Sequence, residues 1–154
     1  MRRNKSGNSN LLGGYMYNLL VLGISESRKA MEQMLGEALK EPERPVSIAI
    51  VDGHGLTIEF ARMDNCRILP QQLAFKKAYT AAIMRSDTLA VSERFKSMGR
   101  TISEMGDPNM AAVQGGIVIQ RASDGAFLGG IGVSGLAADE DEALARLGLD
   151  AMKL

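Results

Sequence analysis

The spacing of hydrophobic residues along this chain changes between the two-residue alternation of strands and the 3.6-residue repeat of helices. These changes predict the order of its strands and helices. The run from Val46 to Val51 is almost continuously apolar, which predicts a strand buried on both faces. The turn sequence Asp52-Gly53-His54-Gly55 follows it. Partial alternation from Leu56 to Met63 then predicts a second strand, so that the two strands form an antiparallel hairpin.

The stretch from Gly115 to Gly135 predicts a second hairpin. Residues 117–119 are β-branched, Ser123-Asp124-Gly125 supplies a tight turn, and Ala126 to Val133 return the chain. The second strand of this hairpin contains glycines at 129, 130 and 132, which weaken a strand because they offer no side chain for packing. We therefore expect a helix, a ligand or another subunit to lie close against that backbone.

Helical periodicity separates the two hairpins and follows the second. A first helix is expected from Ser25 as N-cap, with apolar residues at 31, 34, 35, 38 and 39 facing the core. In a second helix, Gln71 to Arg85, one stripe faces the sheet, whereas Lys77 and Thr80 fall on a mixed face that could border a pocket or a subunit. A short helix from Thr88 to Met98, a loop over 99–109 and a last helix rich in acids from Asp139 complete the chain. Hairpins separated by helices predict an antiparallel sheet with helices on its faces.

A dinucleotide site is excluded, although Gly130, Gly132 and Gly135 have the spacing G-x-G-x-x-G. That site needs a complete strand-helix-strand unit, and only one helix follows these glycines. The four acids at 139–142 would also repel a pyrophosphate at the start of that helix.

Composition narrows the class of partner. A chain of 154 residues with 45% hydrophobic residues fits one globular domain. Eighteen basic and eighteen acidic residues give a net charge of zero, which favours neither nucleic acid nor an anionic membrane. One cysteine, Cys66, and one histidine, His54, cannot build the usual Cys/His zinc site, so no metal site is expected.

Residues 1–23 differ from the rest and are interpreted as a flexible leader, with residues 24–154 as a single domain. Arg2, Arg3 and Lys5 precede an apolar stretch that imitates a signal peptide, but Tyr15 and Asn18 interrupt it. We expect a cytoplasmic protein, and a secreted form is the alternative.

The chain resembles the GlcG/HbpS-like family, whose members are described as haem-binding or haem-degrading proteins. The resemblance runs in collinear order from about Ser25 to the C-terminus. It rests on VSIAIVD at 46–52, Gly55, RMD at 62–64, KAYTA at 77–81, Gly115-Gly116, GGIGVSG at 129–135 and Asp141. The resemblance implies an α/β fold of the α+β type, profilin-like or roadblock-like, with a five-stranded antiparallel sheet flanked by helices. It also implies a homo-oligomer, a dimer or a multiple of dimers, and haem as a candidate cofactor.

A ligand site is expected around Arg62, Asp64, Lys77, Thr80, Gly115, Gly116 and Ser134. An arginine, a lysine, a hydroxyl and accessible backbone N–H groups can hold a carboxylate in one orientation. The competing interpretation is that Arg62 pairs with Asp64 or Asp141 while Lys77 borders a subunit contact.

Three functions stay open at this point. The first is a small-molecule-binding protein whose ligand is a haem-like tetrapyrrole or a small carboxylate. The second is a cofactor-free hydrolase, deaminase or isomerase acting on small unsaturated acids in a catabolic pathway, with a buried lysine or Asp64 as its acid-base group and no assigned catalytic residue. The third is a structural oligomeric adaptor. Leu56 stands where many family members carry a histidine, so we expect haem binding to be weak.

Overall fold

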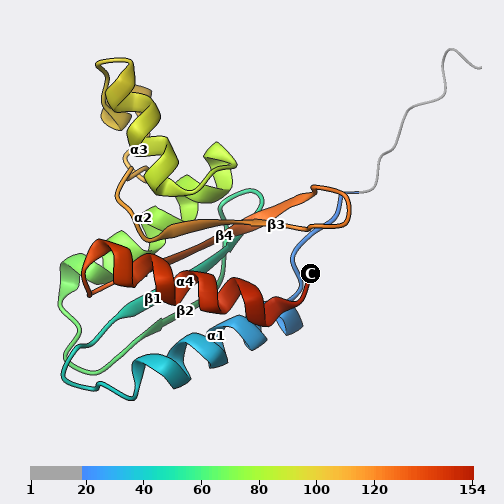
Figure 1. The fold of residues 1–154 in the computed structure, drawn as a ribbon, viewed down its shortest axis with the longest axis vertical. Helices are drawn as coiled ribbons and strands as arrows, with labels where there is room; N and C mark the ends of the chain where they lie inside the picture. The colour runs from blue at the N-terminus through green and yellow to red at the C-terminus, as the bar shows by residue number, and fades with distance from the viewer. Residues whose placement is uncertain (1–18) are drawn as a thin grey trace, which may run out of the picture.

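The computed structural model describes residues 19–154, which form one four-stranded sheet covered by helices on both faces (Figure 1). The strands are β1 (Ser47–Asp52), β2 (Thr57–Arg62), β3 (Gly116–Gln120) and β4 (Phe127–Ser134). Their order in the sheet is β2-β1-β4-β3, and every neighbouring pair is antiparallel. Both predicted hairpins and the antiparallel sheet flanked by helices are confirmed.

The predicted fifth strand is absent from the described part of the chain, so the expectation of five strands was wrong. Between α3 (Thr88–Ser97) and β3 the chain forms only the 3₁₀ helix η1 (Ile102–Met105) and irregular structure. Gly106 adopts a left-handed conformation with φ of 72° and Pro108 lacks an N–H, and neither property suits a strand within a sheet.

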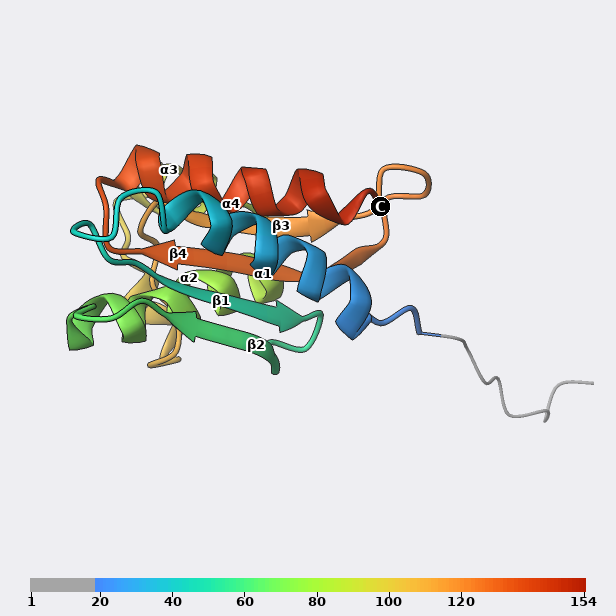
Figure 2. The ribbon, with the colours of Figure 1, turned by 90° about the horizontal axis from the view of Figure 1, so that it is seen from below.

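Alternation along β1 divides the core into two layers. Ile48 and Ile50 point to the face covered by α1 (Ile24–Ala38) and α4 (Ala138–Met152), whereas Ala49 and Val51 point to α2 (Ile68–Met84). Figure 2 shows α1 and α4 side by side on one face of the sheet and α2 on the other. The small residues on the α2 side let this helix approach the sheet closely.

The glycines of β4 allow that approach, which confirms the expectation that something lies close against this strand. A Cβ built on Gly130 would lie 2.2 Å from the carbonyl oxygen of Ala78, and one on Gly132 would lie 2.0 Å from that of Ala74. Both oxygens belong to the backbone of α2. The close neighbour is therefore a helix of the same chain.

Two helix starts differ from the sequence prediction. The N-cap of α1 is Gly23, and the Ser25 side chain bonds to Glu26 instead of capping the helix. The second helix begins at Ile68, three residues early, because Pro70 is tolerated in a first turn where N–H groups have no helical partner.

The predicted leader lies mostly outside the described residues; of it, only residues 19–23 are described, and Leu22 is buried in the core. No helix within residues 19–154 is long and apolar enough to cross a membrane.

Candidate ligand-binding sites

Lys77 on α2 and Asp141 in the first turn of α4 form a buried ion pair. Their side chains are 2% and 3% exposed, and Lys77 Nζ lies 2.8 Å from Asp141 Oδ2. The ammonium also donates to the carbonyl oxygen of Val133, and Asp141 Oδ1 accepts the backbone N–H of Leu136. Burial raises the pKa of Asp141 more than these bonds lower it. The pair therefore joins α4 and the end of β4 to α2, and the predicted mixed face of α2 is a packed face.

Three further predicted residues lie beside this pair, and two of them, Thr80 and Gly116, use polar groups in bonds within the chain. Gly116 donates its backbone N–H to Thr88 Oγ1 at 2.9 Å, and Thr80 Oγ1 accepts the N–H of Ala111 at 2.8 Å. A Cβ on Gly115 would lie 2.8 Å from Lys77 Nζ. The structure thus brings Lys77, Thr80, Gly115 and Gly116 together, but the expected accessible backbone donor at Gly116 is already occupied.

Arg62 and Ser134 lie in one row across the sheet, away from that junction. Each is the antiparallel partner of Ser47, Arg62 on edge strand β2 and Ser134 on β4. Arg62 and Asp64 are exposed, and neither forms an ion pair among the described residues. The alternative pairing of Arg62 with Asp141 was wrong, because Asp141 pairs with Lys77.

A small pocket lies where Ser134 meets the start of α2, and we term it the α2 N-terminal pocket. Its volume is about 230 Å³. The lining residues are Arg67, Leu69, Pro70, Leu73, Ser134, Gly135 and Leu136. Arg67 is the N-cap of α2 and makes no side-chain cap bond. The pocket therefore combines one cation with a helix N-terminus and an apolar wall.

A second small pocket, the His54 pocket, lies at the opposite end of β1. It has a volume of about 140 Å³ and is lined by Leu19, Leu20, Val21, Gly53, His54, Arg85 and Phe127. The guanidinium carbon of Arg85 lies 5.2 Å from the centre of the Phe127 ring. Asp52 Oδ1 accepts the backbone N–H of His54 and fixes the turn. An imidazole, a cation and an apolar surface therefore meet here.

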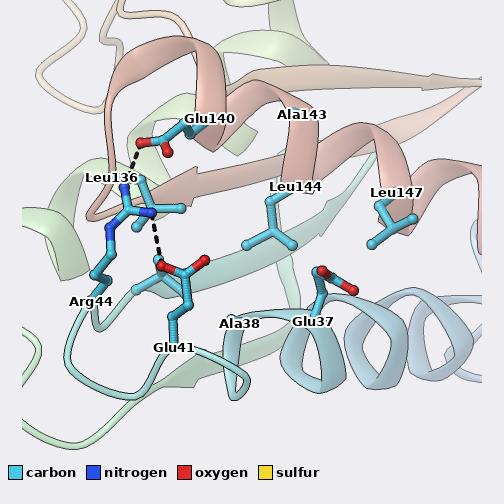
Figure 3. Close-up of a pocket in the computed structure, with 10 residues that line it drawn as sticks. Glu37, Ala38, Glu41, Arg44, Leu136, Glu140, Ala143, Leu144 and Leu147 are labelled. Atoms are coloured by element: carbon cyan, nitrogen blue, oxygen red, sulfur yellow. Dashed lines mark hydrogen bonds and ion pairs between the residues drawn. The ribbon is translucent and has the colours of Figure 1, made fainter.

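A larger hollow than these two pockets is the α1–α4 groove, with a volume of about 430 Å³ (Figure 3). Leu144 and Leu147 of α4 point toward α1 across it. At one end Arg44 lies 3.1 Å from Glu41 and 2.6 Å from Glu140, which ties the loop after α1 to α4. Because Arg44 is already paired with two carboxylates, the groove offers little to an anionic ligand.

Each small pocket is lined in part by residues outside the motifs. The sequence interpretation missed Arg67, Arg85 and Phe127, because they come from segments that meet only in the fold. One signal was available at Arg67, which immediately precedes a helix whose first turn contains Pro70. No group of three metal-ligating side chains occurs within residues 19–154.

The sequence and the fold of this chain are both similar to those of known proteins. The family described as "Haem degrading protein HbpS-like" matches residues 22–150. The crystal structure of a double mutant of HbpS from Streptomyces reticuli superposes with a TM-score of 0.78 at 29% identity, over 90% of this chain and 91% of that one. The crystal structure of a PduOC:heme complex superposes with a TM-score of 0.75 at 25% identity, over 86% and 95% of the two chains.

Two curated relatives extend the comparison. GlcG of Escherichia coli K12 is 34% identical over 89 residues, which are 58% of this chain and 63% of GlcG. The corrinoid adenosyltransferase PduO of Salmonella typhimurium is 28% identical over 120 residues, which are 77% of this chain and 35% of PduO. The matches thus span about a third of PduO and less than two thirds of GlcG.

Proposed function

Because this chain belongs to the HbpS-like family, we propose that it is a small-molecule-binding protein whose ligand is a haem-like tetrapyrrole, held at the His54 pocket. The observation that carries the proposal is the position of the chain's one histidine beside Arg85 and Phe127. Two relatives support the ligand class: one is a PduOC:heme complex and the other is named a corrinoid adenosyltransferase. Haem and corrinoids are both tetrapyrrole macrocycles.

The residues of the His54 pocket fit the three parts of a haem. Histidine is a common axial ligand of haem iron and binds through a neutral imidazole nitrogen, so His54 is the proposed iron ligand. Phe127 and Leu20 offer apolar surface to the ring, and the Arg85 guanidinium matches a propionate. A bound haem would supply the iron for any redox or gas-binding chemistry; the chain's own part is to bind and orient the ring.

The size of the pocket predicts weak binding. Sites that bury most of a drug-sized ligand enclose about 300–1,000 Å³, whereas the His54 pocket encloses about 140 Å³. Much of a tetrapyrrole would therefore remain in water, and the affinity gained from burial would be small.

Hemin titration followed by absorbance tests this function. We expect a saturable but weak Soret change that is lost in His54→Ala and weakened in Arg85→Met. Metal-free protoporphyrin is the matched probe, since it retains the ring and propionates but needs no axial ligand, and Arg100→Met is the control for loss of one exposed arginine. Unchanged hemin binding by His54→Ala would place the ring elsewhere.

The enzyme hypothesis receives less support from the geometry. It needs a buried lysine with an available amine, but the Lys77 ammonium contacts Asp141 and Val133. Asp64, its other candidate, is exposed. A cytoplasmic location stays part of the proposal.

Assembly into a dimer or a multiple of dimers is also part of the proposal. Exposed apolar side chains occur on β2, in the turn before it and on α2, at Leu56, Phe60, Ile68 and Ile83. Such surface favours self-association, and symmetric dimers are its commonest form.

A further inference from the structure

We propose that the α2 N-terminal pocket binds the carboxylate of a compact, otherwise apolar acid, at a second site separate from the His54 pocket. Four features carry this assignment: a hydroxyl with no hydrogen-bond partner among residues 19–154, the positive end of a helix, one arginine and an apolar wall. Each is a property of the residues that line the pocket.

Ser134 supplies the hydroxyl. The residue is 5% exposed, and its hydroxyl makes no hydrogen bond within residues 19–154, whereas its strand partner Ser47 bonds to Cys66. Every fully enclosed side-chain nitrogen or oxygen of the described residues has a partner. The Ser134 hydroxyl is therefore not fully enclosed, and because Ser134 lines the pocket we infer that this hydroxyl can donate to a ligand there.

The electrostatic environment selects an anion. The first N–H groups of α2 have no partner inside the helix, and no side chain caps them. Arg67 adds a full positive charge at the same end of the helix, and no acidic residue lines the pocket. A carboxylate there would accept bonds from a guanidinium, a hydroxyl and a helix N-terminus together.

The remaining wall of the pocket determines the polarity of the ligand beyond its carboxylate. Leu69, Pro70, Leu73 and Leu136 are apolar, so the part of the ligand beyond its carboxylate must be apolar too. A volume of about 230 Å³ admits a single small ring or a short branched chain.

The position of the pocket separates it from the His54 pocket. Ser134 pairs with Ser47 at the start of β1, whereas His54 follows Asp52 at the end of that strand. Five steps along a strand cover about 17 Å at roughly 3.3 Å per residue. A ring ligated at His54 and an acid bound beside Ser134 would therefore occupy opposite ends of the sheet.

Benzoate, with benzamide as a neutral probe of the same shape, tests the site in the chain of 154 residues. Amide chemical shifts in ¹H–¹⁵N spectra report both the place and the affinity of binding. We expect benzoate to shift Leu69, Gly135 and Leu136 and benzamide to leave them nearly unchanged, with no effect of His54→Ala.

Variants then assign the donors. Arg67→Met should weaken benzoate binding at least about tenfold, since a charge-assisted bond contributes about 1.5–3 kcal/mol. Ser134→Ala should weaken it by a few-fold while leaving the unfolding midpoint in place, because the hydroxyl makes no hydrogen bond within residues 19–154. Arg94→Met removes another exposed helical arginine and should change nothing. Equal binding of benzoate and benzamide, equal effects of Arg67→Met and Arg94→Met, or shifts confined to another surface would each overturn the assignment.

Discussion

Removing the Lys77 ammonium should cost this protein a large part of its stability. Lys77→Met keeps most of the apolar stem but leaves the Asp141 carboxylate buried with one remaining donor, the N–H of Leu136. Breaking a buried pair by removing one partner costs about 3–5 kcal/mol. For a urea dependence of about 2 kcal/mol per molar, the midpoint of unfolding should fall by about 2 M.

A second substitution separates the pair from simple loss of packing. Asp141→Asn retains an oxygen that can accept the Leu136 N–H but carries no charge. Adding it to Lys77→Met should therefore restore about 1 kcal/mol or more, although each change alone destabilises the protein. Lys40→Met is the matched control, since Lys40 forms an exposed pair with Glu37, and it should change the free energy of unfolding by no more than about 0.5 kcal/mol.

The pH dependence of the Lys77→Met variant gives an independent test. Burial already raises the pKa of Asp141 above its unfolded value, and removal of the lysine should raise it further. A carboxyl whose pKa is raised in the folded state stabilises the fold below its unfolded pKa, and this stability is lost as pH rises through the folded pKa. The deficit of the variant should therefore be smaller at pH 5 than at pH 8. A deficit below about 1 kcal/mol, strict additivity with Asp141→Asn, or the opposite pH trend would refute the reasoning.

Two further predictions concern the exposed surface. Analytical ultracentrifugation at micromolar concentrations should give a dimer or a multiple of dimers, and replacing Phe60 with a lysine should shift it toward monomer; a wild-type monomer would contradict the proposed assembly. The guanidinium of Arg121 lowers the pKa of Asp124 to about 2, so stability from this contact should be present above the unfolded pKa and be lost as pH falls toward about 2. Urea unfolding between pH 5 and pH 2 should show a shallower pH dependence for Asp124→Asn, and an identical dependence would contradict the contribution.

The sequence by itself determined the strands that are marked by strong local patterns. The apolar run at 46–51 predicted the inner strand β1, and the turn at 123–125 predicted the β3–β4 hairpin. The glycines at 130 and 132 also predicted a close neighbour, because a strand residue without a side chain lets another backbone approach the strand closely. These features are local, so they can be interpreted without the fold.

Only the tertiary structure decided which polar residues remain available to a ligand. The sequence predicted that Lys77, on a mixed helical face, would be available to a ligand. In the structure its ammonium is paired with the carboxylate of Asp141, 64 residues away. Conversely, the predicted site residue Ser134 stays available because its hydroxyl makes no hydrogen bond within residues 19–154, and Arg67 became a candidate because helix α2 begins one residue after it. Pairing depends on contacts between residues far apart in the chain, and periodicity within one element carries no information about them.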